Sequence, residues 1–538
     1  MALERDIYRA LEDVVGPEHI SEDPAILDSY AWCGLYATAR KPVTPEVEKR
    51  EELRDPFTSR AEAILLPGNT GEIQAIIKLC NRFRIKFKAF STGWIGGNIL
   101  APPGGILLDL RRMNRIVEIN EKNMYAVVEP YVISGQLHAE LIKRGLVHNV
   151  LSAGAQTSAL PLAAQQGTGH LSQTTSNGER NVLAVEWVTP EGEIVALGSL
   201  GSSGEWFCGD GPGPSLRGII RGITTPQGGL GVYTKAATKV YHWPGPPSLP
   251  MEGISPHYAP KEIPPNLMIR YFSFPSHEKI DEAQRKIGES ETVFAFMGFP
   301  IAMIVANIAT SNQEEVELLP RLRAMVQGPG FLVVVAGNSQ REFEYKKRVL
   351  HKIIDETDGK SLEYLEDPKI GGSLLWRTLR PTADARTLFR ATGYFGAIFP
   401  GHSQFLPITK HTQQVMDWKA KNLIPKGLVF DDDGCAFPWT EEHGWFAHAE
   451  AFFRFGGRPD SIKAVQQTIA EAWKLHLKEP VGVPFDAVGD QLHDLMGPST
   501  SNYHLWLRKI KKAFDPNGTA DSARYITAKE PPVENKRP

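Results

Sequence analysis

A β-α-β pattern that leads into a glycine-rich loop constrains this chain more than any other feature. Residues 63–66 are typical of a short strand, and Thr70 is the expected N-cap of a helix with one apolar face. Residues 85–89 alternate as a second strand does. The loop that follows ends at a further apolar run, residues 106–110, and its glycines are Gly93, Gly96, Gly97, Gly104 and Gly105.

A loop of this kind can bind pyrophosphate without a helix. Glycines allow positive φ angles and let successive backbone N–H groups point into one concavity. The helix that follows a Rossmann G-x-G-x-x-G loop is missing, because Pro102, Pro103 and then a strand come next. Taken alone, the loop is more simply explained as an ordinary glycine-rich connection. The neighbouring segments must therefore decide whether it binds pyrophosphate.

Two more glycine-rich passages follow on the same framework, at residues 152–181 and 209–241. The proline-rich segment 243–247 then marks a domain boundary. From about residue 265 to 480 strands and helices alternate, which predicts a sheet covered by helices on one side. Within this part, the strongly apolar residues 294–308 are expected to form a buried strand or helix.

Composition narrows the class of protein. A chain of 538 residues is too long for one core, and its net charge of −3 without a basic run argues against a nucleic-acid partner. The four cysteines lie far apart without a C-x-x-C pair, which argues against a zinc ribbon or an internal iron–sulfur cluster. The N-terminus lacks signal-peptide character and no apolar run is long enough for a membrane span, so we expect a cytoplasmic protein.

The order of these features resembles the flavoproteins of the vanillyl-alcohol oxidase superfamily with a PCMH-type FAD-binding domain, which include D-lactate dehydrogenases and the flavoprotein component of glycolate oxidase. AILLPGNTGEIQAIIKLCNRFRIKFKAFSTGWIGGN is similar to the opening β-α-β unit and pyrophosphate loop, and IKKAFDPNG to the C-terminal helix. The resemblance implies FAD as cofactor and an α+β fold. It places a two-lobed FAD-binding domain at 1–245, a cap domain with a helix-covered sheet at 246–490, and a segment that returns to the FAD domain at 491–538.

The resemblance also implies which residues contact FAD. Residues 91–98 would wrap the pyrophosphate, residues 167–170 would approach the flavin edge, and residues 228–232 would lie near the adenine and ribitol. The cofactor-binding residues expected on this basis are Ser91, Thr92, Gly93, Trp94, Ile95, Gly96, Gly97, Asn98, Gly167, Thr168, Gly169, His170, Gly229, Gly231 and Val232.

Two departures from the family pattern bear on the chemistry. Members with a histidine in the pyrophosphate loop attach FAD there covalently, whereas this chain has Trp94 and Ile95. Phenol-oxidising members carry a tyrosine in that loop and a Tyr-Arg pair before the last helix. Here Ile95 and Gly482-Val483 stand at those places, which argues against a phenol oxidase.

The segment WFAHAEAFFRF, residues 445–455, is the main candidate for catalysis. As a strand it would present a base (His448), an acid (Glu450) and a guanidinium (Arg454) on one face between aromatic rings. A base could take the substrate's hydroxyl proton while hydride moves to the flavin. Arg454, Arg377 or Arg380 could hold a carboxylate or phenolate. The alternative is a solvent-facing strand whose polar side chains form a salt-bridged surface.

His402 completes the set of candidate catalytic residues. With His448 and Glu450 it has the ligand types of the divalent-metal site that some 2-hydroxy-acid dehydrogenases of the family carry. The G-D-G-N-x-H run of those members is absent, and their later E-H-G run is expected to be absent as well, so we assign no metal. His448 is also the one candidate for covalent attachment of FAD, because it lies near the cap position at which some members tether the flavin methyl.

Three hypotheses for function remain open at this point. The first is an FAD enzyme that oxidises a C–H bond next to oxygen in a small, anionic alcohol or 2-hydroxy acid. Its electrons would pass to oxygen, a quinone, or a partner iron–sulfur or cytochrome subunit, and we expect a homo-oligomer. The second is oxidation of a para-substituted phenol. The third is a flavin-bearing electron-relay subunit of a complex, without its own substrate site.

Overall fold

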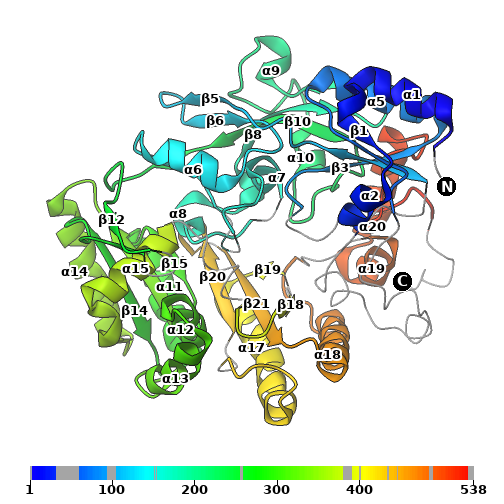
Figure 1. The fold of residues 1–538 in the computed structure, drawn as a ribbon. Coiled ribbons are helices and arrows are strands. Elements are labelled where there is room, and N and C mark those ends of the chain that lie inside the picture. Colours follow the sequence, from blue (N-terminus) through cyan, green and yellow to red (C-terminus); the bar gives the residue numbers. More distant parts are fainter. Residues whose placement is uncertain are drawn as a thin grey trace.

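The computed structural model describes residues 3–31, 60–93, 104–150, 152, 154–165, 167–254, 258–379, 390–398, 401–432, 436–444, 446–483 and 489–530. An N-terminal domain built on two sheets lies above a cap built on two further sheets (Figure 1). The expected α+β architecture, with a two-lobed first domain and a cap, is confirmed.

The first lobe contains the predicted β-α-β unit. Its sheet has the order β1 (Ile20–Ser21), β2 (Ala63–Leu65), β4 (Gly105–Asp109) and β3 (Lys86–Phe90), with β4 parallel to both neighbours. Helices α1 (Arg5–Val15) and α5 (Thr70–Phe83) pack together against it, and α2 (Pro24–Ala31) lies nearby.

The N-cap of helix α5 lies one residue earlier than we expected. Asn69, not Thr70, is the N-cap, and its side chain accepts a hydrogen bond from the Glu72 amide. The Thr70 hydroxyl instead donates to Glu186 of the second lobe. The apolar face is buried as predicted, because it packs on the sheet.

The second lobe is an antiparallel sheet. Its order is β5 (Ile116–Asn120), β6 (Tyr125–Val128), β10 (Val232–Lys239), β8 (Val182–Val188) and β9 (Ile194–Ala196). The connections carry the short helices α6 (Ser134–Ile142), α7 (Ala159–Ala164), α8 (Ser172–Thr175), α9 (Ser199–Ser202) and α10 (Arg217–Ile220) and a ribbon of β7 (Leu146–Val147) with β11 (Tyr241–His242).

The cap begins after the proline-rich segment and a small ribbon of β12 (Met251–Glu252) with β13 (Ala259–Pro260). One cap sheet has the order β15 (Ala295–Met297), β16 (Gly330–Ala336), β14 (Leu267–Ser273) and β17 (Lys360–Ser361). In the other, β21 (Phe446–Phe455) pairs with β18 (Tyr394–Ile398), β19 (His402–Ser403) and β20 (Phe437–Glu441).

Helices cover the first cap sheet on both faces rather than on one. On one face lie α11 (His277–Ser290) and α14 (Gln340–Glu356), and on the other α12 (Ile301–Ile308) and α15 (Pro368–Leu379). The apolar run 294–308 supplies both a strand and a helix, because Pro300 separates β15 from α12. The cap is completed by α13 (Asn312–Arg323), α17 (Phe405–Asn422) and α18 (Pro459–Lys478).

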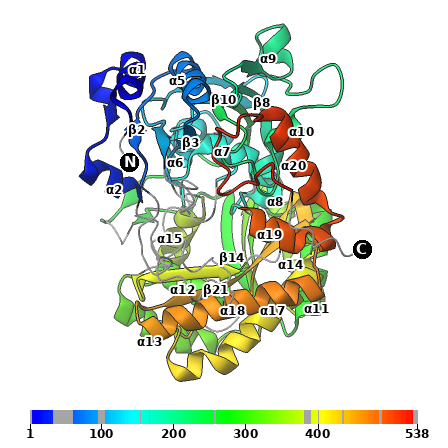
Figure 2. The same ribbon diagram turned by 90° about the vertical axis from the view of Figure 1, so that its right-hand side faces the viewer.

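The chain then returns to the N-terminal domain through α19 (Gly489–Met496) and α20 (Tyr503–Phe514) (Figure 2). Phe514 stacks on Trp187 of β8 with ring centroids 5.3 Å apart. Beyond the helix, Ala520 lies beside Phe87 of β3 in a parallel bridge. The C-terminal segment therefore contacts strands of both lobes of the N-terminal domain.

A buried ion pair lies inside the cap. The Arg454 guanidinium on β21 donates to Glu315 of α13 at 2.6 Å, and Arg390 donates to the second oxygen of the same carboxylate at 2.6 Å. Both the Arg454 and Glu315 side chains are 1% exposed. Removing the carboxylate would leave two guanidinium groups without this partner in a region of low dielectric.

We therefore predict that Glu315→Ala lowers the free energy of unfolding of the cap by about 3–5 kcal/mol. Chemical denaturation followed by tryptophan fluorescence measures this change. Glu317→Ala is the matched control, because Glu317 is exposed on the same helix. Equal stability of the two variants would contradict the assignment.

Candidate functional site

All three glycine-rich passages contribute residues to one cavity in the N-terminal domain. Ser91, Thr92 and Gly93 leave β3 and form one wall, while residues 225–228 with Gly231 and Val232 form another. Residues 157–165, which include α7, line the cavity between them. The expected contacts Trp94, Ile95, Gly96, Gly97 and Asn98 lie outside the described residues.

Two glycines in this cavity have backbone conformations that other residues rarely adopt. Gly231 has φ +96°, and a Cβ atom there would lie 2.2 Å from the Val188 carbonyl oxygen. Gly228 has φ +86°, and the nearest atoms to its Cβ position lie 3.8 Å away. Backbone without side chains therefore forms this wall, which fits the close approach of a phosphate-bearing cofactor.

Gly229, another expected contact, belongs to the same loop but is not among the residues that line the cavity. A Cβ atom there would lie 2.8 Å from the Tyr525 side chain, and the Gly229 carbonyl accepts a hydrogen bond from Lys511. Gly167, Thr168, Gly169 and His170 do not line this cavity either. They are buried where the N-terminal domain meets the cap.

The contacts of residues 167–170 reach across to the cap. The Thr168 hydroxyl donates to Glu441 at 2.8 Å, and the His170 Nδ1 atom lies 3.0 Å from the Thr378 carbonyl oxygen. Arg377, a candidate for binding a substrate anion, is the neighbour of Thr378 on α15 and is 7% exposed. This loop and α15 thus form part of the junction between the domains.

The junction also holds a pair of buried histidines. His402 and His448 are register partners on β19 and β21, with ring centroids 5.1 Å apart. The side chain of His448 is 0% exposed and its Nε2 atom lies 3.2 Å from Glu450 Oε1. The alternative of a solvent-facing strand is therefore wrong, because β21 is covered on both sides.

Carboxylates set the charge of this pair. Glu441, on β20, is fully buried and its Oε2 atom lies 3.5 Å from His402 Nδ1. Burial alone would lower the pKa of His402, but the charge of Glu441 and its hydrogen bond, together with the charge of Glu179, raise that pKa above its ordinary value. Burial raises the pKa of Glu179 itself.

Arg454 does not belong to this cluster. Although it shares a strand with His448, it pairs with Phe395 of β18 at the far end, roughly 20 Å away by strand rise. Its guanidinium is bound to Glu315 and lies over the Phe430 ring at 4.6 Å. His448 and Glu450 lie on one face of β21 with their side chains in contact, and Arg454 lies outside this group.

Among the described residues, no group of three or more His, Cys, Asp or Glu side chains is arranged to hold a metal ion. Residues 442–444 read Glu-His-Gly, a later run that the metal-binding members of the family also carry and that we overlooked in the sequence. In this structure Glu442 pairs with Arg180 of the N-terminal domain at 2.7 Å.

Sequence reasoning missed several residues of the site. Lys88 lines the cavity and is 2% exposed, with its ammonium 2.8 Å from Asp521. Gln227 lines the same cavity, and Glu441 and Glu179 surround His402. Lys86 and Lys88 stand at alternate positions of a strand, a pattern that suggests a solvated face. No local pattern shows that Lys88 pairs with a residue as distant in sequence as Asp521.

Known proteins resemble this chain in the sequence of its N-terminal domain and in the fold of the whole chain. Residues 61–198 match the family model FAD_binding_4, described as an FAD binding domain. A probable mitochondrial D-lactate dehydrogenase of Danio rerio is 23% identical over 317 residues, 59% of this chain and 56% of that protein. The glycolate oxidase subunit GlcD of Bacillus subtilis is 25% identical over 238 residues, 44% of this chain and 45% of that protein.

The 4-cresol dehydrogenase flavoprotein subunit of Pseudomonas putida is 29% identical over 174 residues, 30% of this chain and 32% of that protein. The alignments thus span only about a third to just over half of these relatives. The solved structure of p-cresol methylhydroxylase with substrate bound has the same fold, with a TM-score of 0.74, 16% identity, and coverage of 98% of this chain and 99% of that one.

No helix in the described ranges is both long and apolar enough to cross a membrane. The matched domain indicates FAD as the cofactor. The chain carries an FAD-binding domain at residues 61–198, and the relatives that it matches are flavoproteins of the vanillyl-alcohol oxidase superfamily, as the resemblance predicted.

Proposed function

We propose that the protein is an FAD-dependent oxidoreductase that oxidises a C–H bond next to oxygen in a small, anionic alcohol or 2-hydroxy acid. The observation that carries this proposal is the buried pair His402 and His448, surrounded by carboxylates at the domain junction. When bound, FAD supplies an acceptor for the hydride that leaves the substrate carbon. Relatives named for D-lactate and glycolate, both 2-hydroxy acids, support this substrate class.

The two histidines take different roles in this proposal because their neighbours differ. Glu441 and Glu179 favour the cationic form of His402, which then binds the substrate carboxylate. His448, whose ring centroid lies 5.1 Å from that of His402, is the group that accepts the hydroxyl proton in this proposal. Glu450 orients the His448 ring, and Arg377 is the further candidate for binding the anion.

The electrons then pass to oxygen, to a quinone or to a separate iron–sulfur or cytochrome subunit. A separate subunit is supported by the relative from Pseudomonas putida, whose name describes it as the flavoprotein subunit of its enzyme. The same relative favours a second candidate function, oxidation of a para-substituted phenol. Against that function, Gly482 and Val483 stand where phenol-oxidising members carry a Tyr-Arg pair.

The test of the proposal is anaerobic reduction of the purified holoprotein. We expect 2-hydroxy acids to bleach the flavin absorbance, while simple alcohols and para-alkylphenols react slowly or not at all. Bleaching by alkylphenols alone would favour the second candidate. If no compound in the panel bleached the flavin and an artificial reductant did, an electron-relay subunit would replace both. Acid denaturation of the same sample would show whether FAD is covalently attached.

We predict that His448→Ala slows bleaching by about 10²–10⁴-fold, because a general base contributes a factor of that size. FAD content should stay the same, which the absorbance ratio of flavin to protein measures. His351→Ala is the control, since His351 is exposed on α14. A wild-type bleaching rate in His448→Ala would remove this residue from the reaction.

The pH dependence gives a separate prediction for Glu441. Substrate affinity should be present below the pKa of His402 and lost as pH rises through it, because only the cation binds the carboxylate. Glu441→Gln removes the charge that raises this pKa, so the loss should move to lower pH. Steady-state KM across pH measures the shift, with Glu317→Gln as control. An unmoved KM profile, or one displaced to higher pH, would argue against this role for His402.

A further inference from the structure

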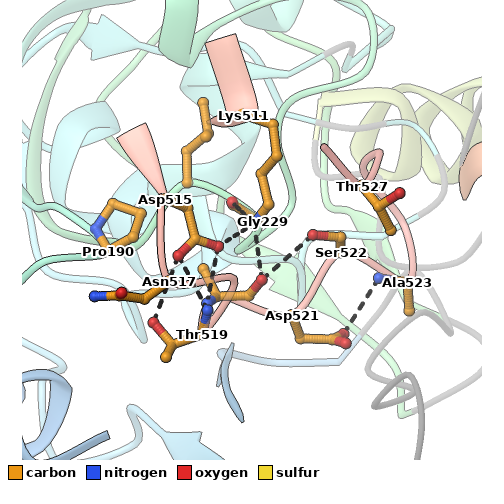
Figure 3. Close-up of polar contacts among 12 residues, drawn as sticks. Pro190, Gly229, Lys511, Asp515, Asn517, Thr519, Asp521, Ser522, Ala523 and Thr527 are labelled. Atoms are coloured by element: carbon orange, nitrogen blue, oxygen red, sulfur yellow. Dashed lines mark hydrogen bonds and ion pairs between the residues drawn. The ribbon is translucent and has the colours of Figure 1, made fainter. Parts of the chain in front are cut away.

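The last turn of α20 binds the cavity loop of the second lobe through one buried lysine. Lys511 has a side chain that is 3% exposed. Its ammonium donates to the Gly229 carbonyl at 2.7 Å, to the Ala520 carbonyl at 2.8 Å and to the Asp515 carboxylate (Figure 3). These three bonds use all three donors of the ammonium group.

Asp515 connects residues 519 and 520 to the same lysine through its two carboxylate oxygens. Its Oδ1 atom accepts a hydrogen bond from the Thr519 amide at 3.0 Å, and its Oδ2 atom accepts one from the Ala520 amide at 3.2 Å (Figure 3). The Asp-Pro-Asn-Gly run after the last helix therefore closes a compact turn. This turn delivers residues 519–521 to the first lobe.

The same segment binds β3, on the opposite side of the cavity. The Phe87 amide donates to the Thr519 carbonyl at 2.9 Å, and the Asp521 amide donates to the Phe87 carbonyl at 2.9 Å. Asp521, fully buried, holds the ammonium of Lys88, which lines the cavity. A few residues later, Arg524 donates to Gln227, which lines the cavity from the second lobe, at 2.7 Å.

One short segment thus contacts two walls of the FAD cavity that belong to different lobes. We propose that Lys511 is a positioning residue for the cofactor: with residues 515–524 it fixes the glycine loop at 228–231 relative to β3. Without the bond to its carbonyl, Gly229 loses an anchor directly beside the backbone that faces FAD. Affinity for FAD then falls because binding must also order the loop.

Lys511→Met tests this role, since methionine keeps much of the buried stem but forms none of the three bonds. We expect the Kd for FAD, measured by quenching of flavin fluorescence on titrating the apoprotein, to rise by about tenfold or more. Lys512→Met is the matched control, because Lys512 is the exposed neighbour on the same helix. Its Kd should equal that of the wild type.

The melting temperature of each apoprotein separates positioning from general stability. A folded Lys511→Met with a lower melting temperature but a wild-type Kd would overturn the proposal. If this variant does not fold, Arg524→Met decides, because it removes the bond that links the C-terminal segment to Gln227. A raised Kd in Arg524→Met supports the proposal and an unchanged one overturns it. FAD affinity is measured without substrate, so the outcome is independent of the reaction proposed above.

Discussion

The backbone pairing of residues 519–521 with β3 is the contact on which the FAD site most depends. β3 is the edge strand of its sheet, and an uncovered edge would leave N–H and C=O groups without partners. The C-terminal segment bonds to that edge and at the same time buries Asp521 against Lys88. The same segment therefore covers the edge of the sheet and fixes the position of the Lys88 ammonium at the cavity wall.

The second constraint is electrostatic and lies at the domain junction. Carboxylates buried there need partners, and they find them across the boundary, since Glu442 pairs with Arg180 and Glu441 accepts from Thr168. Two of the polar bonds that join the cap to the N-terminal domain are thus made by Glu441 and Glu442, which are adjacent in sequence and lie between His402 and His448. Docking of the two domains and the charge of His402 depend on the same side chains.

Local pattern was sufficient to predict much of this structure. The sequence predicts the strands and the helix of residues 63–90, because their apolar periodicity is a short-range pattern. It predicts the alternation of strands and helices in the cap for the same reason. Alternation along 446–455 correctly placed His448 beside Glu450. It could not show that both faces of the strand are covered, nor that Arg454 has a partner on α13, because period-two patterns do not reveal what packs on each face. Asn69 and Thr70 are both good N-caps, so sequence alone did not separate them.

The sequence could not predict the ion pair at the cavity wall for a different reason. Lys88 and Asp521 lie at opposite ends of the chain, and nothing in either local segment marks the other. The cofactor residues expected from resemblance at 91–93 and 231–232 do line the cavity, whereas those at 167–170 lie at the junction. The resemblance therefore predicts the cofactor and some of the residues that line the cavity. The other lining residues are brought there by tertiary contacts that the sequence does not show.

The long separation between β3 and its C-terminal partner has a consequence for synthesis. During translation the first lobe emerges early, yet β3 keeps an open edge until residues 519–521 leave the ribosome, after the whole cap. The backbone partners of this strand therefore become available only after the whole cap has been made, so the first lobe cannot reach its final form on its own.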